Sequence, residues 1–241
     1  MTNNWKERTE LLLGQQKVQM LKEKQVLVIG LGGVGAYAAE MLCRAGIGKL
    51  TIVDGDVVQA SNRNRQLIAL RSNEGRKKAE IMKERLLDIN PDLEIIAYST
   101  YLKDQAILDV VDSSNFDFVV DAIDTLAPKV FLIHYCVTKN IRIVSSMGAG
   151  GKLDPSKIQI ADISKSHNDN LARMIRKRLH KFGIYSGIPV VFSNEKVDKS
   201  VIKLVENEEN KKSTVGTISY LPPMFGCMIA SVVIRNLTDN L

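Results

Sequence analysis

The chain has 241 residues, 45% of them hydrophobic and 25% charged, which excludes an intrinsically disordered protein and favours one domain with a sizeable core. Its formal net charge of +6 fits a polyanionic partner, but solubility alone explains that charge equally well unless the cations cluster. The polar N-terminus predicts that there is no signal peptide, and the longest apolar run, Met224–Ile234, is too short to predict a membrane span. Three scattered cysteines predict neither a disulfide frame nor structural zinc, so a cytoplasmic protein is expected.

Short apolar runs alternate with helical periodicity through the first 150 residues. The first 22 residues are expected to be helical, with one apolar face made of Leu11, Leu12, Val18 and Leu21. The strands predicted next are Val26–Ile29, Leu50–Val53, Leu93–Ala97, Phe116–Val120 and Ile141–Val144. The helices predicted between them lie near Ala38–Cys43, Glu74–Ile89, Gln105–Val111 and Pro128–Thr138. Near-continuously apolar strands are buried on both faces, so the pattern predicts a Rossmann-like, doubly wound, mainly parallel α/β sheet with helices on both faces.

The alternation changes after the glycine-rich run Gly148–Gly151. The elements expected beyond it are a strand at Ile158–Ile163, a basic helix at Leu171–Phe182, a strand at Pro189–Phe192, an exposed polar loop at Glu195–Ser213 and a final helix at Pro223–Leu237. We therefore predict that residues 1–150 form an ATP-binding half with an N-terminal helix. Residues 151–241 are predicted to form a substrate-facing and tRNA-facing C-terminal half of the same domain.

The strongest local signal is the run Gly30–Gly35, which fits G-x-G-x-x-G between a predicted strand and a predicted helix. In this pattern Gly30 permits the tight turn, Gly32 the close approach of phosphate, and Gly35 the close packing of helix on strand. Asp54 follows the next predicted strand, where a carboxylate can accept hydrogen bonds from ribose hydroxyls. Together they predict a nucleotide site but leave the nucleotide open, and the loop alone would suggest a nicotinamide dinucleotide.

A polar and basic segment follows Asp54 and favours ATP over a dinucleotide. It reads Ser-Asn-Arg-Asn-Arg-Gln over residues 61–66 and Gly-Arg-Lys-Lys over residues 75–78. A triphosphate attacked at its α-phosphorus needs cations because charge develops on the pyrophosphate leaving group, whereas a dehydrogenase holds its pyrophosphate mainly with backbone amides. Arg65 and Lys78 would supply such charge, although solvated positions on a helix face would explain them as well.

Five motifs in order over residues 30–124 resemble the ubiquitin-activating-type (ThiF/MoeB-like) adenylyltransferases. They are the glycine run, Asp-x-Asp at 54–56, Ser-Asn-x-Asn-Arg-Gln at 61–66, Gly-x-x-Lys at 75–78 and Asp-Ala-Ile-Asp at 121–124. The resemblance implies that the cofactors are ATP and Mg²⁺, with Asp54 on the ribose and Asp124 on the metal. It implies phosphate contacts for Asn62, Arg65, Gln66 and Lys78. Without it, Asp121 and Asp124 would be interpreted as helix caps after a strand.

The N-terminal segment Arg8–Gly14 also resembles the opening helix of that family, whose arginine reaches across a dimer into the neighbouring active site. The resemblance implies a homodimer in which Arg8 plays this part; taken alone, Arg8 would be interpreted as a surface residue. The catalytic set that the resemblance implies is Arg8, Arg65, Lys78 and Asp124.

The C-terminal half indicates the branch of the family. Branches that activate ubiquitin or sulfur-carrier proteins commonly carry Cys-x-x-Cys pairs, which this chain lacks, and Cys43, Cys136 and Cys227 are interpreted mainly as core residues. Segments at 148–155, 160–165, 189–195 and 216–222 resemble the branch that dehydrates threonylcarbamoyladenosine in tRNA. The resemblance implies ATP-dependent cyclisation through an acyl-adenylate. The alternatives are adenylation of the C-terminus of a ubiquitin-like or sulfur-carrier protein, and a nicotinamide-dependent or purely binding Rossmann protein; a sulfur-transfer partner stays unknown.

The predicted helix at 171–182 supports a nucleic-acid partner independently of the resemblance. Its cations are Arg173, Arg176, Lys177, Arg178 and Lys181, and no acidic residue occurs between Asn170 and Asn194. A helix that is merely solvated usually intersperses acids for pairing along the helix, which makes contact with tRNA phosphates the better interpretation and a solvated face the alternative.

Overall fold

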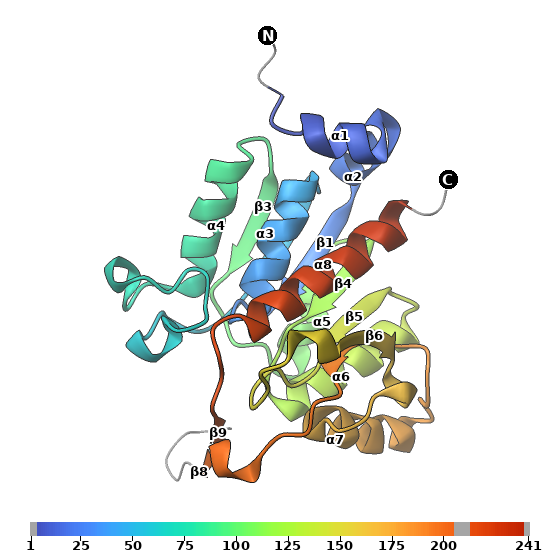
Figure 1. The fold of residues 1–241 in the computed structure, drawn as a ribbon. Helices are drawn as coiled ribbons and strands as arrows, with labels where there is room; N and C mark the ends of the chain where they lie inside the picture. The colour runs from blue at the N-terminus through green and yellow to red at the C-terminus, as the bar shows by residue number, and fades with distance from the viewer. Residues whose placement is uncertain (1–3, 205–212, 239–241) are drawn as a thin grey trace.

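The computed structural model describes residues 4–204 and 213–238, and this part of the chain forms a seven-stranded sheet in the order β3-β2-β1-β4-β5-β7-β6 (Figure 1). The strands are β1 (Gln25–Ile29), β2 (Lys49–Val53), β3 (Glu94–Tyr98), β4 (Phe118–Asp121), β5 (Ile143–Ser146), β6 (Ile158–Asp162) and β7 (Pro189–Ser193). All neighbouring strands are parallel except β6, which runs antiparallel to β7 at the edge. The predicted α/β fold class with a mainly parallel sheet is confirmed.

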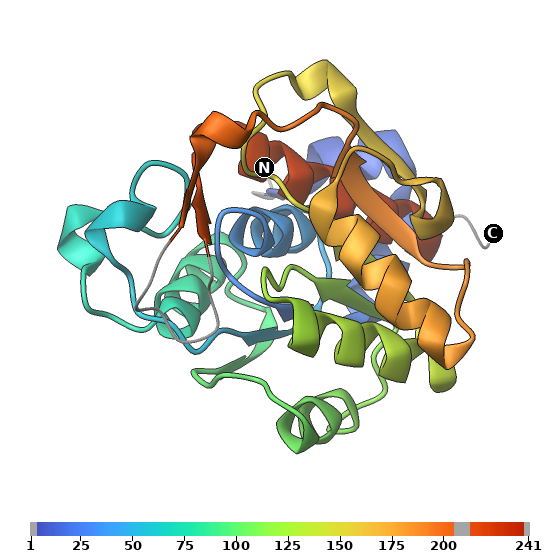
Figure 2. The same cartoon turned by 90° about the horizontal axis from the view of Figure 1, so that it is seen from below.

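Helices cover both faces of this sheet, because the strands carry apolar side chains on both sides. One face is covered by α2 (Gln15–Glu23), α3 (Gly35–Ala45), α4 (Lys78–Ile89) and α8 (Leu221–Thr238). The other is covered by α5 (Gln105–Val111), α6 (Leu126–Thr138) and α7 (Asn170–Leu179). Alternate residues of β1 belong to opposite cores: Val26 and Val28 to the first, Leu27 and Ile29 to the second. Figure 2 shows α3 and α8 on one side of the sheet and α5 and α6 on the other.

The N-terminal segment departs from the single helix that its periodicity predicts. It forms α1 (Glu7–Leu13) and α2, separated at Gly14, whose φ of +86° is a backbone conformation that favours glycine. The break turns the two helices apart, so Leu11 and Leu12 are 81% and 83% exposed while Val18 and Leu21 are buried. The expected common apolar face was therefore wrong for the two leucines of α1.

Two other boundaries differ for local reasons. Helix α4 begins at Lys78 rather than Glu74, because Gly75 has a φ of +82° and Lys77 pairs with Val57 in an isolated β-bridge. The basic helix ends at Leu179 and continues as a 3-10 turn through Phe182. The side chain of Phe182 is exposed, whereas Ile175 and Leu179 of the helix are buried.

The segment expected to be a polar loop contains regular structure. Strand β8 (Ile202–Leu204) pairs antiparallel with β9 (Ser213–Val215), and residues 205–212 of the expected loop lie outside the described residues. Further 3-10 turns are Ala60–Asn62, Arg71–Asn73, Pro155–Lys157, Ile163–Lys165 and Lys199–Val201.

The final helix is longer than the sequence suggested. α8 has 18 residues and is, by length and composition, apolar enough to cross a membrane, with 56% of it buried in the protein. It packs closely along α3: a Cβ atom on Gly226 would lie 2.4 Å from the carbonyl oxygen of Val34. The apolar run Met224–Ile234 predicted a segment too short for a span; in the structure the helix has the length but packs as a core element.

Candidate active site

The glycine run forms a tight turn where β1 meets β4 and α3. A Cβ atom on Gly30, whose φ is +90°, would lie 2.7 Å from the carbonyl oxygen of Ala122, just after β4. A Cβ atom on Gly35 would lie 1.7 Å from the carbonyl oxygen of Gly30. Both positions therefore require glycine for backbone packing, and the turn brings the first amides of α3 to the carboxyl edge of the sheet. Amides at a helix start are a ready site for phosphate.

Asp54, at the carboxyl end of β2, fastens this turn. Its Oδ2 accepts a hydrogen bond from the amide of Leu31 at 2.6 Å, and its Oδ1 accepts one from the amide of Asp56 at 2.8 Å. Burial raises the pKa of Asp54, and the positive charge of Lys78 opposes that shift. The carboxylate thus lies beside the glycine run, where its expected ribose contact would be made.

Lys78 is buried, so the alternative of a solvated helix-face position is wrong for this residue. Its side chain is 4% exposed, and its Nζ lies 2.8 Å from Oδ2 of Asp56. The other oxygen of Asp56 accepts a hydrogen bond from the hydroxyl of Tyr101 at 2.6 Å. That bond raises the pKa of Tyr101 to about 12, so the phenol remains a donor at neutral pH. Tyr101 lies beyond β3, and no sequence motif pointed to it.

Arg65 and Gln66 lie over the glycine run. The Cγ of Arg65 is 3.5 Å from a Cβ atom built on Gly33, and the Nε2 of Gln66 is 3.7 Å from one built on Gly32. Nη1 of Arg65 donates to the carbonyl of Ser61 at 3.1 Å, which holds the guanidinium over the turn. The structure thus brings together the glycine run and two of the four predicted phosphate contacts.

Asn62 has a structural contact besides the phosphate contact that the family resemblance implies. It is buried, and its Oδ1 accepts a hydrogen bond from the amide of Gln59 at 3.1 Å in a reciprocal capping arrangement. The side chain therefore shapes the turn that carries Arg65, and its expected contact with phosphate stays a prediction.

Gln66 carries an unsatisfied acceptor in this site. Its Oε1 is buried and has no hydrogen-bond partner in the part of the chain that the structure describes. A buried acceptor without a donor is costly and calls for an explanation. Water or a bound molecule could supply that donor beside the glycine run.

The two aspartates after β4 serve different purposes. Asp121 is fully buried, 2.9 Å from the equally buried Nζ of Lys129, and its Oδ2 accepts a hydrogen bond from the hydroxyl of Ser145 at 2.6 Å. Lys129 also donates to the carbonyl of Ile123 at 2.9 Å and so holds the turn that leads to Asp124. The sequence analysis missed Lys129, whose one signal is a lone cation on an otherwise apolar helix.

Asp124 is exposed at the end of this turn and near Arg65. Burial lowers the pKa of Arg65, and the negative charge of Asp124 acts in the opposite direction. No cluster of three or more His, Cys, Asp or Glu side chains suited to a metal occurs within residues 4–204 and 213–238. One carboxylate beside a phosphate site nevertheless fits Mg²⁺, which proteins usually bind through one or two carboxylates, substrate phosphates and water.

The helix α7 and the 3-10 turn that follows it expose four of the five cations predicted for the basic helix. Arg173, Lys177, Arg178 and Lys181 are exposed, and none of them forms an ion pair with a described residue. Arg176 differs because it is half-buried and donates to the carbonyl of Ser166 at 2.8 Å and to the hydroxyl of the same residue. Arg176 therefore anchors the loop before the helix as well as adding charge.

Arg8 lies far from Lys78 within one chain. It is exposed on α1, where the neighbouring Lys6 packs within 3.5 Å of a Cβ atom built on Gly46, at the carboxyl end of α3. The glycine run is at the other end of α3, a helix of 11 residues and therefore about 16 Å long. Figure 1 shows α1 near the amino ends of the strands, whereas the glycine run follows the carboxyl end of β1.

The cysteines carry no sign of an activated thiolate. Cys43 and Cys136 are buried, and burial raises the pKa of each to about 12. Cys227 is exposed on α8, and partial burial of its thiol raises its pKa as well. A nucleophilic cysteine requires the opposite shift.

Comparison with known proteins identifies relatives of the whole chain. The family model of the ThiF family matches residues 7–240. The tRNA threonylcarbamoyladenosine dehydratase of Bacillus subtilis (strain 168) is 39% identical over 97% of this chain and 94% of its own. The crystal structure of the Escherichia coli tRNA N6-threonylcarbamoyladenosine dehydratase in complex with ATP matches with a TM-score of 0.88 and 33% identity, over 99% of this chain and 96% of that one.

A relative with another substrate matches a smaller part of the chain. The sulfur carrier protein ThiS adenylyltransferase of Escherichia coli (strain K12) is 37% identical over 58% of this chain. The resemblance that the sequence motifs indicated is therefore confirmed over nearly the whole chain for these tRNA-modifying relatives, and over little more than half of it for this adenylyltransferase.

Proposed function

The chain belongs to the ThiF family, and we propose that it is an ATP-dependent enzyme that dehydrates threonylcarbamoyladenosine in tRNA to a cyclic form. The observation that carries this proposal is that Arg65 and Gln66 lie over the glycine run, while Asp54, which is bonded to that run, is under the electrostatic influence of Lys78. The relatives that match nearly the whole chain bear the proposed activity in their names.

The first step activates the carboxylate of the threonylcarbamoyl group, since hydroxide is too poor a leaving group to be expelled directly. A carboxylate oxygen attacks the α-phosphorus of ATP, and the bond to the β-phosphate oxygen breaks, giving an acyl-adenylate and pyrophosphate. Arg65 and Lys78 stabilise the charge that develops on the pyrophosphate, and Asp54 holds the ribose. Asn62 and Gln66 complete the nucleotide contacts.

The second step closes the ring. The neighbouring carbamoyl group attacks the activated acyl carbon and expels AMP, so the net change is the loss of one water from the substrate while ATP becomes AMP and pyrophosphate. The nucleophile belongs to the same molecule as the acyl carbon, so positioning supplies most of the rate. No cysteine nucleophile is required, in keeping with the raised pKa values of the thiols.

The remaining assignments belong to the same proposal. Asp124 holds Mg²⁺, which neutralises phosphate charge when it is bound. The protein acts in the cytoplasm as a homodimer, and Arg8 serves the site of the neighbouring subunit. The exposed cations of α7 contact tRNA phosphates.

AMP release tests the proposal. Purified protein should release AMP when it is given ATP, Mg²⁺ and tRNA that carries threonylcarbamoyladenosine, and the product nucleoside should be lighter by one water in mass spectrometry. The matched control is the same tRNA without the modification, which lacks the carboxylate and should release none. AMP release that depends on a small carrier protein and ignores the tRNA would establish the alternative activity.

A further inference from the structure

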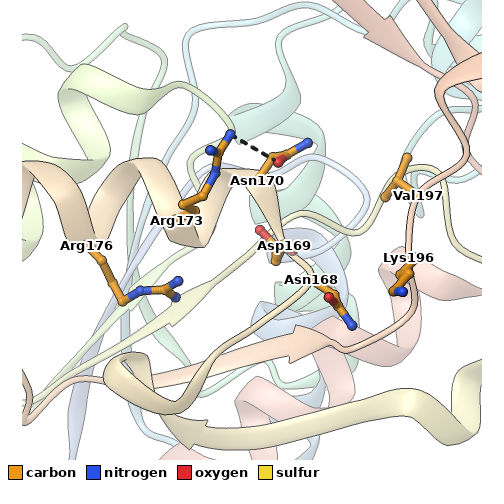
Figure 3. Close-up of a pocket in the computed structure, with 7 residues that line it drawn as sticks. All are labelled: Asn168, Asp169, Asn170, Arg173, Arg176, Lys196 and Val197. Carbon is orange, nitrogen blue, oxygen red and sulfur yellow. Dashed lines mark hydrogen bonds between the residues drawn. The ribbon is translucent and has the colours of Figure 1, made fainter.

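A cationic pocket lies beside the N-terminal end of α7, away from the nucleotide turn. It has a volume of about 400 Å³ and is lined by residues of two loops and one helix (Figure 3): Asn168, Asp169, Asn170, Arg173, Arg176, Lys196 and Val197. The volume accommodates a phosphate group with its water, since one water occupies about 30 Å³. Neither Arg173 nor Lys196 forms an ion pair with any residue in the described ranges.

The one acidic residue of this lining is already neutralised. Oδ2 of Asp169 lies 2.8 Å from the buried Nζ of Lys152 and accepts a hydrogen bond from the amide of Gly148 at 3.1 Å. Its Oδ1 accepts a hydrogen bond from the amide of Ala172 and so caps the helix. The helix end is thus satisfied within the chain, and the positive charge offered to a ligand comes from side chains.

Two further contacts keep the pocket open and free of negative charge. The side-chain amide of Asn168, whose φ of +54° suits asparagine, donates to the carbonyl of Asn194 at 2.9 Å and ties the two loops together. The neighbouring Glu195 directs its carboxylate to the amides of Leu153 and Asp154, at 3.0 and 2.8 Å. The walls are therefore held in place before any ligand binds.

The pocket lies at the same ends of the strands as the glycine run, where a large substrate could reach both. Strands β1, β4, β5 and β7 are consecutive in the sheet, and their carboxyl ends share one edge. Gly148 follows β5 and Lys196 follows β7, so the pocket lies about 14 Å, or three strand spacings, from the glycine run. The phosphates of ATP are accounted for at that run, and a second anion site on the same edge serves a ligand that extends beyond ATP.

We propose that Arg173 and Lys196 together hold one phosphodiester of the tRNA backbone near the modified nucleoside, an inference that rests on the proposed function. An arginine fork and a lysine point charge that line one pocket are well suited to a phosphate, once Arg173 leaves its 3.4 Å hydrogen bond to Oδ1 of Asn170 (Figure 3). The contact sets the register of the RNA on the sheet edge and carries no base specificity. Lys196 lies outside the basic helix and adds a second element to the RNA surface.

The salt dependence of tRNA binding tests whether the two cations share one phosphate. Binding of threonylcarbamoyl-modified tRNA is measured against KCl concentration for wild type, Arg173→Ala, Lys196→Ala and the double variant. Each single variant should bind roughly tenfold more weakly and lose roughly one unit of slope. The double variant should lose the same single unit. A slope lowered by two units, or not lowered at all, would overturn the shared site.

The matched control is Lys139→Ala, which removes one exposed charge at the opposite edge of the sheet and should leave the slope unchanged. Asn170→Asp separates binding from folding. An acid in the first turn of a helix is favourable, so thermal stability should stay equal or rise, while the new carboxylate repels phosphate and weakens tRNA binding severalfold. Unchanged tRNA affinity in Asn170→Asp would contradict the proposal.

Two comparisons identify the source of the phosphate and separate this inference from the proposed function. If Lys196→Ala lost binding of inorganic phosphate but kept the wild-type slope for tRNA, the pocket would serve a free anion and the inference would fail. Modified tRNA and ATP given to the same wild-type preparation should release AMP. If the wild-type protein releases AMP but the variants keep the wild-type salt dependence of tRNA binding, only the phosphate site in the pocket is refuted. If the wild-type protein releases no AMP, the proposed function is refuted, and with it the assignment of tRNA as the ligand of the pocket.

Discussion

At the scale of single residues, the proposed adenylation depends most on the charge of Lys78. Its Nζ reaches the site from a buried side chain and is held by Asp56, which Tyr101 holds in turn. This chain of contacts fixes the ammonium before ATP arrives. A preorganised charge is worth more than a mobile one, because no energy is spent on orienting it during the reaction.

Replacing Lys78 with methionine should abolish most activity and leave the fold intact. Methionine has a side chain of similar length but carries no charge, so AMP release should fall about 100-fold or more. Asp56 is 47% exposed and stays hydrated without its partner, so the free energy of unfolding should change by no more than about 1 kcal/mol. AMP release and urea unfolding measure the two effects.

The adjacent Lys77 is the control for this variant. Lys77→Met removes the same charge from the residue that precedes α4, and its rate of AMP release should stay within about twofold of wild type, as for a charge outside the site. A Lys78→Met protein that turns over at a near wild-type rate would remove Lys78 from the catalytic set.

At the scale of elements, one buried ion pair joins α7 to the sheet in addition to the apolar contacts of the helix. Lys152 and Asp169 are each 1% exposed and 2.8 Å apart, and Lys152 also donates to the carbonyl of Ser193 at 3.0 Å. The pair thereby joins the end of β7 to the first turn of the helix. Because the charges are buried, each depends on the other for its solvation.

Removing one member of that pair should be strongly destabilising. Lys152→Met leaves the Asp169 carboxylate buried without its counter-charge, so the free energy of unfolding in urea should fall by about 3–5 kcal/mol. The pair Lys49–Glu94 has a similar distance of 3.1 Å but is 41% and 71% exposed, so Lys49→Met should cost less than about 1 kcal/mol. Equal losses in the two variants would show that burial does not govern this contact.

The elements themselves were largely predictable because their signals are local. Each of the seven strands of the main sheet lies within about two residues of the strand expected from an apolar run, and the glycine run marked the turn between β1 and α3. The break at Gly14 was missed because helical periodicity continues across it. The short strands β8 and β9 were missed because their pairing joins segments of a polar stretch that carries no alternation.

Motifs in the sequence named residues that the structure places near the glycine run, and no motif named the residues whose part depends on burial. Arg65, Gln66 and Lys78 belong to spaced motifs. Lys129 and Lys152 do not, and a lysine in a sequence is normally interpreted as a surface residue because burying its charge requires a partner that only the fold supplies. Nothing in the sequence distinguishes the half-buried Arg176 from the exposed cations beside it, so its contact with Ser166 could not be predicted.

At the scale of the whole molecule, the carboxyl and amino ends of the parallel strands carry different features. The carboxyl edge carries the nucleotide turn and the cationic pocket. The opposite edge carries α1, with Leu11 and Leu12 exposed beside Arg8. A helix that exposes two leucines and lies away from its own site is suited to a subunit interface, where the leucines would be covered and Arg8 would reach a neighbouring site.

Complementation between two inactive variants tests this arrangement. Arg8→Ala and Lys78→Met should each fold, form dimers and release little AMP alone. After mixing and subunit exchange, a heterodimer has one site with Lys78 from one chain and Arg8 from the other. Random re-pairing makes about half of the dimers mixed, each with one good site of two, so activity should recover to roughly one quarter of wild type. If exchange is verified by differently tagged chains and activity stays absent, Arg8 acts within its own chain or has no catalytic part.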